Sequence, residues 1–251
     1  MNPFFFGRAD RPLFGLYTPA RAGAPAARSV LLCYPAGPEY MRAHRAFRQL
    51  NTLLNRAGMN VLRFDYSCTG DSGGDGTEAT YGDWLSDIGV AIDELKDNSM
   101  VDTVDVVGLR WGATLAVQAC RDREDVDRLI MWDPIVSGRA YLDAHLGETR
   151  PTGTIGIEGF PFSQVLREAM DGVDLVANLD AVKPAVALVV AEDRPEYRAL
   201  KSTLDRVAGS SDFEVAVSSG DWAQADPFGD ALIPQQIIQA IVDRLQTQVV
   251  S

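Results

Sequence analysis

The sequence is poor in the residues and runs that build metal sites, disulfide scaffolds and membrane spans. Only two histidines, His44 and His145, and three cysteines occur among the 251 residues. The cysteines are odd in number and widely spaced, so they match neither a zinc motif nor a disulfide framework. No apolar run approaches the ~18 residues of a membrane span, and the N-terminal residues lack the basic and apolar parts of a signal peptide. We therefore predict no metal site, no cofactor and no membrane partner.

Positive charge is also in deficit. Lys and Arg number 23 against 35 Asp and Glu, which gives a formal net charge of −12. A surface this acidic disfavours nucleic acid and anionic membranes as partners. Hydrophobic residues make up 46% of the chain, a share typical of soluble globular proteins. We expect a cytoplasmic protein that acts on a small molecule, and the sequence leaves a homodimer open.

Short β-rich runs alternate along the chain with segments of helical period. Strands are expected at 13–20, 29–35, 60–66, 104–110, 128–136, 185–192 and 213–219. Helices are expected at 43–58, 80–98, 111–122, 196–209 and 231–246. This alternation predicts an α/β fold with a mostly parallel sheet covered by helices on both faces.

One segment interrupts the alternation. Residues 137–183 lie between two expected strands, and they are too many for a plain connection. They include a helical stretch of their own over 163–179. We interpret 137–183 as a cap inserted into a core formed by 1–136 and 184–251. Its aromatic side chains, Tyr141 among them, are expected to line an apolar pocket over the sheet edge.

The stretch VVGLRWGATLA, residues 106–116, has the outline of a nucleophile elbow. An apolar strand is followed by glycine, two residues, a second glycine and an alanine-rich helix. A serine hydrolase places its serine between the two glycines, where this chain has Arg110. Arginine is not deprotonated in proteins, so it cannot attack a carbonyl as serine does.

Several phrases match one known family. VVGLRWGATLA, FFFGRADRPLFGLYTP, EYMRAHRAFRQL, VLRFDYSCTGDSGGD and MWDPIVSGRAYL resemble the α/β-hydrolase superfamily. The resemblance is to its branch related to serine aminopeptidases and to exosortase-A-system-associated hydrolases. It covers nearly the whole chain and implies an eight-stranded sheet with an inserted cap. It also suggests a role in bacterial biosynthesis, including natural-product assembly.

The resemblance also implies a catalytic triad, in which two of three positions are substituted here. The family places an acid after a late strand, where this chain has Glu192 or Asp193. It places a histidine after the last strand, where the chain has Asp221 followed by Trp222. Both histidines lie elsewhere, one in the first helix and one in the cap. Ordinary acyl-serine turnover is thus excluded.

Chemistry without a serine remains open at the same crevice. Arg110, Asp193 and Asp221 are expected to converge at the strand ends, either as a structural ion network or as an acid–base site. Backbone N–H groups near Trp111 and in the turn after the second expected strand would form an oxyanion hole. That turn contains Ala36, Gly37 and Pro38.

Two further candidates follow other strands. Cys68, in DYSCTGDSGG, would be a thiolate nucleophile with His44 as its basic partner, or else a small residue that fills a gap. Asp133, in MWDPIV, is either a further acid at the crevice or a residue that turns the chain.

Three functions therefore remain. The first is an enzyme that acts on an acyl, ester, thioester or polyketide-like molecule, free or bound to a carrier protein, by acid–base, elimination, cyclisation or acyl-processing chemistry. The second is a non-catalytic binding protein. The third is a Cys68-dependent acyl hydrolase or transferase.

Overall fold

Eight strands form one twisted sheet at the centre of the computed structural model, which describes residues 1–20, 28–147, 151–217, 222 and 233–247. The first two strands pair antiparallel, and β2 is antiparallel to β4; the other neighbours are parallel. The order across the sheet is β1 (Asn2–Gly7), β2 (Pro12–Thr18), β4 (Asn60–Phe64), β3 (Ser29–Cys33), β5 (Val104–Leu109), β6 (Val126–Trp132), β9 (Ala185–Val190) and β10 (Ser211–Val215). The predicted mostly parallel eight-stranded sheet is confirmed.

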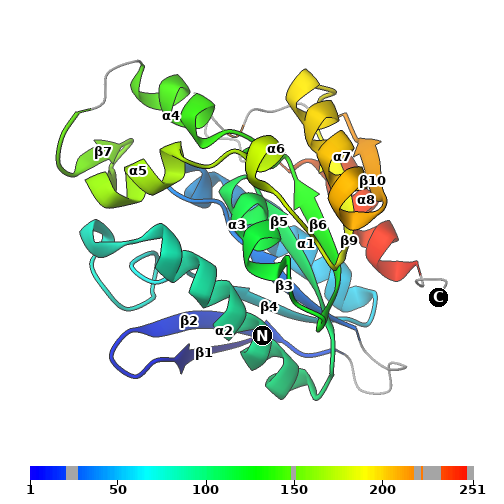
Figure 1. Ribbon diagram of the computed structural model, residues 1–251. Coiled ribbons are helices and arrows are strands. Elements are labelled where there is room, and N and C mark those ends of the chain that lie inside the picture. The colour runs from blue at the N-terminus through cyan, green and yellow to red at the C-terminus, as the bar shows by residue number, and fades with distance from the viewer. Residues whose placement is uncertain (21–27, 148–150, 218–221, 223–232, 248–251) are drawn as a thin grey trace.

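Helices cover both faces of the sheet (Figure 1). The helix α1 (Pro38–Arg56) packs beside α8 (Gln235–Gln246) on one face, and α2 (Tyr81–Ser99) packs beside α3 (Trp111–Cys120) on the other. The helix α7 (Pro195–Ala208) lies against the β9–β10 edge. Every residue of β3, β4 and β5 is buried, as expected for parallel strands covered on both faces.

Several elements differ from the sequence prediction: β6 is observed at 126–132 rather than 128–136, and β10 at 211–215 rather than 213–219. The strand β1 was not predicted, because NPFFFG has no alternation of apolar and polar residues. The helix α1 begins at Pro38 rather than at residue 43, since proline is pre-organised for the first helical position. The last helix begins at 235, after Pro234, rather than at 231.

Residues 137–183 lie between β6 and β9, and the part of this segment outside 148–150 contains five short elements. These are α4 (Gly138–Leu146), β7 (Ile155–Ile157), β8 (Phe160–Phe162), α5 (Gln164–Asp171) and α6 (Leu175–Asn178). The predicted single helix over 163–179 is wrong: the chain breaks after α5, and the Asp174 carboxylate accepts hydrogen bonds from the first amides of α6. The elements α4, α5 and β7 lie together beyond one end of the sheet (Figure 1).

A close backbone contact joins α4 to α5. A side chain at Gly138 would place its Cβ 1.7 Å from the carbonyl oxygen of Met170. Side chains of α4, β8 and α5 continue the hydrophobic core of the sheet without a break. In the part of the chain that is described, no helix is both long and apolar enough to cross a membrane.

Candidate active site

The turn between β5 and α3 has the backbone geometry of an elbow. Arg110 has φ 55° and ψ −119°, a conformation that costs energy for any residue with a Cβ. Gly108 and Gly112 make the turn possible. A Cβ added at Gly108 would lie 2.4 Å from the carbonyl oxygen of Gly112. A Cβ added at Gly112 would lie 2.2 Å from the carbonyl oxygen of Cys33. The strained turn presents the side chain of Arg110 at the carboxyl end of β5.

The Arg110 guanidinium is held by two acceptors. Its Nε donates to Glu39 Oε1 over 3.1 Å, and its Nη1 donates to the main-chain carbonyl of Asp133 over 3.3 Å. A guanidinium has five N–H donors, so these bonds leave donors for a ligand. The side chain keeps 15% of its surface exposed.

The carboxylate paired with Arg110 was not among the residues singled out from sequence. Glu39 lies in the first turn of α1 and is 0% exposed, and its Oε2 has no hydrogen-bond partner among the described residues. Burial raises the Glu39 pKa, while the neighbouring charge and hydrogen bond of Arg110 oppose that rise. In the sequence, an acid in a first turn indicates only an interaction with the helix dipole, so nothing in the sequence pointed to this pair.

Asp133 and Trp222 form a hydrogen-bonded pair in the same cavity wall as Arg110. Asp133 follows β6; its Oδ1 accepts the Ala191 amide over 2.8 Å, and its Oδ2 accepts the Trp222 indole N–H over 3.4 Å. The Trp222 ring packs edge to face on Trp132, with centroids 5.5 Å apart. Burial raises the pKa of the Asp133 carboxyl. An indole N–H donates but takes up no proton, so this pair lacks a base.

A cavity of about 740 Å³ opens above these groups. We call it the Arg110 cavity. It is formed by the ends of β5, β6 and β9, the first turn of α7 and the inner face of α4. Its walls include Arg110, Asp133, Ile135, Tyr141, His145, Tyr197 and Trp222. This volume lies in the range of sites that take drug-sized ligands.

The helix α4 contributes two side chains of interest to this cavity. The Tyr141 hydroxyl is buried without a hydrogen-bond partner among the described residues, and burial raises the Tyr141 pKa. The Tyr141 ring packs edge to face on Trp111 at 5.4 Å. The second side chain, His145, packs at a tilt against the Tyr141 ring, with ring centroids 4.3 Å apart. The Tyr141 hydroxyl therefore stays protonated at neutral pH.

The expected pairing of Arg110 with Asp193 is wrong. Asp193 forms an ion pair with Arg198 of α7, with 2.7 Å between Asp193 Oδ1 and Arg198 Nε, because the two are close in sequence and both exposed. The carboxylate that pairs with Arg110 comes from α1 instead. Asp221 lies outside the described residues.

The turn expected to supply an oxyanion hole lines a different cavity. Ala36 and Gly37 form part of the wall of a cavity of about 270 Å³, together with Cys68, so we call it the Cys68 cavity. A Cβ at Gly37 would lie 2.8 Å from the ring of Phe162. The β8 strand thus covers this turn, and the predicted oxyanion residues do not line the same cavity as Arg110. Trp111 is 0% exposed and lines neither cavity.

The geometry does not support a Cys68–His44 dyad. His44 packs against Tyr40 and Tyr34, at ring-centroid distances of 4.7 and 5.3 Å, and does not line the Cys68 cavity. Burial raises the Cys68 pKa and lowers the His44 pKa. Both shifts oppose a thiolate–imidazolium pair.

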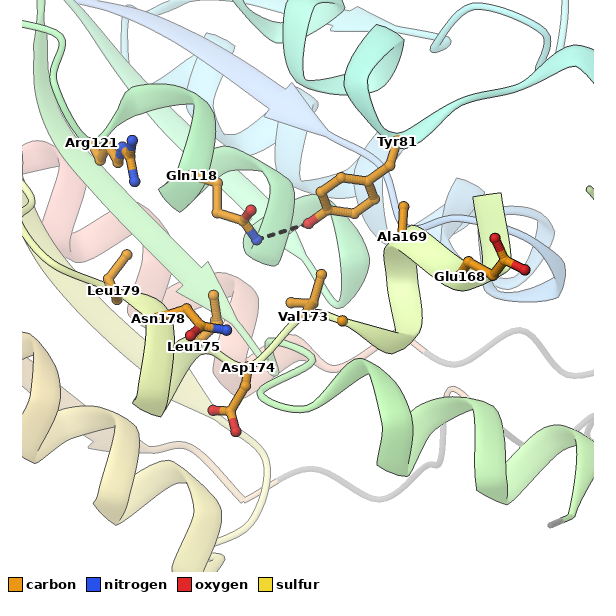
Figure 2. Close-up of a pocket in the computed structure, with 11 residues that line it drawn as sticks. Tyr81, Gln118, Arg121, Glu168, Ala169, Val173, Asp174, Leu175, Asn178 and Leu179 are labelled. Atoms are coloured by element: carbon orange, nitrogen blue, oxygen red, sulfur yellow. Dashed lines mark hydrogen bonds between the residues drawn. The ribbon is translucent and has the colours of Figure 1, made fainter. Parts of the chain in front are cut away.

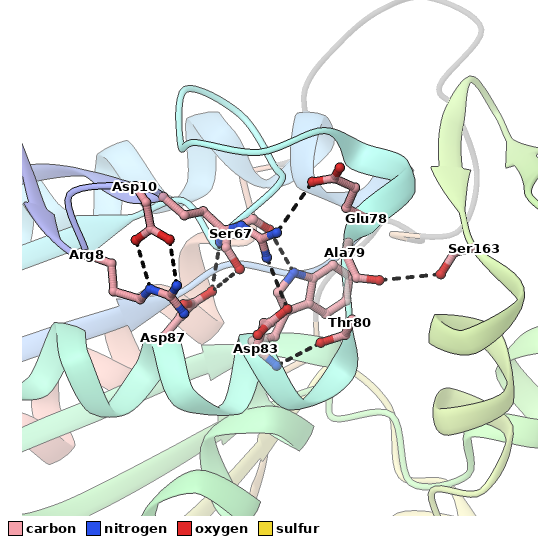
Figure 3. Close-up of polar contacts among 11 residues, drawn as sticks. Arg8, Asp10, Ser67, Glu78, Ala79, Thr80, Asp83, Asp87 and Ser163 are labelled. Atoms are coloured by element: carbon pink, nitrogen blue, oxygen red, sulfur yellow. Dashed lines mark hydrogen bonds and ion pairs between the residues drawn. The ribbon is translucent and has the colours of Figure 1, made fainter.

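The loop that carries Cys68 is fixed by its own polar contacts, several of which Figure 3 shows. The Ser67 amide and hydroxyl donate to Asp87 over 2.8 and 2.7 Å, and the indole N–H of Trp84 donates to the Ser67 carbonyl over 3.1 Å. The Ser163 hydroxyl donates to the Ala79 carbonyl over 3.4 Å and joins the loop to α5. These bonds indicate a structural loop. No cluster of three or more metal-ligating side chains occurs among the described residues.

A further hollow of about 310 Å³ lies between α2, α3 and the segment from α5 to α6 (Figure 2). Gln118 Nε2 donates to the Tyr81 hydroxyl across its wall over 2.8 Å. None of the residues predicted from sequence lines this hollow.

No protein-family model and no curated protein matches the sequence. Solved structures do match over almost the full length. Est1E from Butyrivibrio proteoclasticus, in a structure with ferulic acid bound, superposes with a TM-score of 0.71 at 13% identity and covers 97% of this chain and 96% of its own. The chain has the α/β-hydrolase fold.

Two more structures with this fold cover the chain equally well. Proline iminopeptidase from Mycobacterium smegmatis gives a TM-score of 0.65 at 13% identity, with 97% of both chains covered. Mouse alpha/beta hydrolase domain-containing protein 10 gives 0.62 at 18% identity, with 98% of this chain and 97% of its own covered. Identities this low establish the α/β-hydrolase fold and not the chemistry.

Proposed function

We propose that this chain binds a small acyl or carbonyl-bearing molecule in the Arg110 cavity and processes it without an acyl-serine intermediate. The observation that carries the proposal is the guanidinium at the elbow, which lines the cavity with donors left over from its bonds to Glu39 and Asp133. Guanidinium donors bind carboxylate and polarised carbonyl oxygens. The relatives in fold include an esterase from Pyrococcus furiosus and the ferulic acid complex of Est1E, so acyl compounds are the first class to test.

The walls of the cavity favour an apolar body on the ligand. Aromatic rings of Tyr141, Tyr197 and Trp222 stand around the cation, and Ile135 and Val136 follow β6. A molecule that fits has one oxygen function against Arg110 and an aromatic or aliphatic remainder against these side chains. Ferulate and shorter aryl carboxylates meet that description.

Calorimetric titration of a panel of aryl and alkyl carboxylates, with their methyl esters, tests the proposal. Arg110→Lys keeps the charge but loses the fork of donors, so carboxylate affinity should fall about tenfold, since a charge-assisted hydrogen bond contributes about 1.5–3 kcal/mol. The double variant Arg110→Met with Glu39→Gln removes both charges and should bind no carboxylate. Equal binding by all three proteins would refute the proposal.

A binding protein without catalysis is the second candidate. The observation that favours it is Trp222, which donates to Asp133 where the fold's base would stand. Ester turnover separates the two: binding with no product from any methyl ester of the panel would favour the second candidate. Under either candidate function, a serine-directed fluorophosphonate probe should not label the protein.

The Cys68-dependent hydrolase is the least supported of the three functions. The thiol lies in the smaller cavity, its pKa is raised by burial, and His44 does not line that cavity. Full turnover by Cys68→Ala would eliminate this function.

A further inference from the structure

The second histidine of the chain lies in the wall of the Arg110 cavity. His145 is in the last turn of α4 and is half-buried. It belongs to the segment between β6 and β9, far in the sequence from the position where the fold's base follows the last strand. Sequence reasoning set it aside for that reason.

One hydrogen bond assigns the roles of its two ring nitrogens. His145 Nδ1 lies 2.8 Å from the main-chain carbonyl oxygen of Tyr141, one turn earlier. A carbonyl only accepts, so Nδ1 carries the hydrogen, and the lone pair of the neutral ring is then on Nε2. Tilted packing against the Tyr141 ring, with centroids 4.3 Å apart and an interplanar angle of 34°, supports the imidazole in this orientation.

The other groups at the site are poorer proton acceptors. Both oxygens of Asp133 already accept hydrogen bonds. Glu39 is fully buried and paired with Arg110, and the Trp222 indole takes up no proton. Of the described side chains in the cavity wall, His145 alone has an imidazole ring, and its Nε2 lone pair has no hydrogen-bond partner among the described residues.

We propose that His145 is the general base of this site and that the activity is proton transfer from carbon. This rests on the proposed function in one respect: the substrate must place an oxygen against Arg110. Nε2 takes a proton from the carbon next to a carbonyl, and the C–H electron pair moves toward the carbonyl oxygen. Arg110 stabilises the negative charge there, and the imidazolium returns the proton to the same carbon. The substrate class is a small molecule with an acidic C–H beside a carbonyl.

Charged groups of both signs share the cavity with His145. The titratable side chains that share the cavity wall with His145 and Tyr141 are Arg110, Asp133, Glu192, Arg194, Glu196 and Tyr197, and the Glu39 carboxylate acts on it from α1.

The base is tested with 5-nitrobenzisoxazole, a probe whose isoxazole ring opens when a base removes the proton on C3 of that ring. The C–H electrons form the nitrile, the N–O bond breaks, and the phenolate oxygen takes the negative charge beside Arg110. Full-length wild type is compared with His145→Gln, and with His44→Gln as the matched control at the only other histidine. We expect kcat/KM to fall at least about a hundredfold in His145→Gln and to stay within about twofold in His44→Gln.

Two readouts separate a base from a structural role. The pH profile of kcat/KM should follow the protonation curve of His145, which proton NMR resolves because the chain has two histidines. Added imidazole should restore part of the rate of His145→Ala. A wild-type rate no higher than that of buffer, or equal rates for wild type and His145→Gln, would overturn the inference.

The carboxylate titration above is read independently. Arg110-dependent binding without a His145-dependent rate refutes this inference and leaves the proposed function standing. A His145-dependent rate without Arg110-dependent binding refutes the proposed function alone.

Discussion

Replacing Arg110 by alanine should destabilise the protein, because Glu39, 71 positions earlier in the chain, loses the partner of its buried charge. Glu39 is 0% exposed, and Arg110 supplies its ion pair. Removing one partner of a buried pair costs about 3–5 kcal/mol, because it leaves a buried charge uncompensated. For a protein of this size, that corresponds to a fall in Tm of about 6–20 °C, at about 2–4 °C per kcal/mol.

The loss should depend on pH in a defined direction. The folded pKa of Glu39 is raised above its unfolded value by burial, so the unfolded state loses this proton first as pH rises. The free energy of unfolding therefore falls as pH rises from the unfolded pKa through the folded one. Without Arg110 the folded pKa rises further, since the charge and hydrogen bond that lower it are gone. The deficit of Arg110→Ala relative to wild type should be small near pH 4 and grow toward pH 8.

Thermal unfolding followed by circular dichroism across this pH range measures both effects. The double variant Arg110→Ala with Glu39→Gln has no buried charge, so it should recover at least half of the lost Tm. Glu39→Gln alone should cost only about 1–2 kcal/mol, because the cavity leaves Arg110 partly hydrated. A double variant no more stable than Arg110→Ala, or a deficit independent of pH, would show that the Glu39 charge does not set the stability of this site.

Other predictions concern the elbow, the acid and the thiols. Gly112→Ala should lower the free energy of unfolding, measured by chemical denaturation, by at least about 3 kcal/mol, since the new Cβ would lie 2.2 Å from a backbone carbonyl oxygen. Gly82→Ala is the control: a Cβ there has nothing within 4 Å, so this variant should be neutral or more stable by up to about 1 kcal/mol. Trp222→Phe should lower the free energy of unfolding by about 1 kcal/mol, because Asp133 loses a donor. The three cysteines are buried, so a thiol reagent should titrate less than one equivalent before denaturation and three after it; rapid native labelling would contradict that burial.

The fold was predictable because its signals are local and repeated. Apolar β-rich runs alternating with helical periods specify parallel strands covered by helices, and the sheet confirms this. The missed strand β1 is an edge strand that pairs only with β2, and three consecutive phenylalanines hide its alternation. The prediction of one helix over 163–179 was wrong because the periodicity alone did not reveal that Asp174 is the N-cap of a second helix, α6.

The site was predictable only in its backbone. The two glycines around LRW indicated the elbow, since only residues without a Cβ allow α3 to approach β3 and β5 so closely. Three of the chosen side chains, Arg110, Asp133 and Tyr141, do line one cavity. Ala36, Gly37 and Cys68 line another, because β8 lays Phe162 over the turn.

The sequence by itself determined the order of elements, the strained elbow and the arginine in place of serine at position 110, since each depends on residues that are neighbours in the chain. Only the tertiary structure decided which carboxylate neutralises the guanidinium, which residue stands beside Asp133 and which histidine reaches the cavity. Glu39, Trp222 and His145 come from three segments distant in the chain. Contacts between such side chains depend on how packed elements are oriented, and no local pattern encodes that orientation.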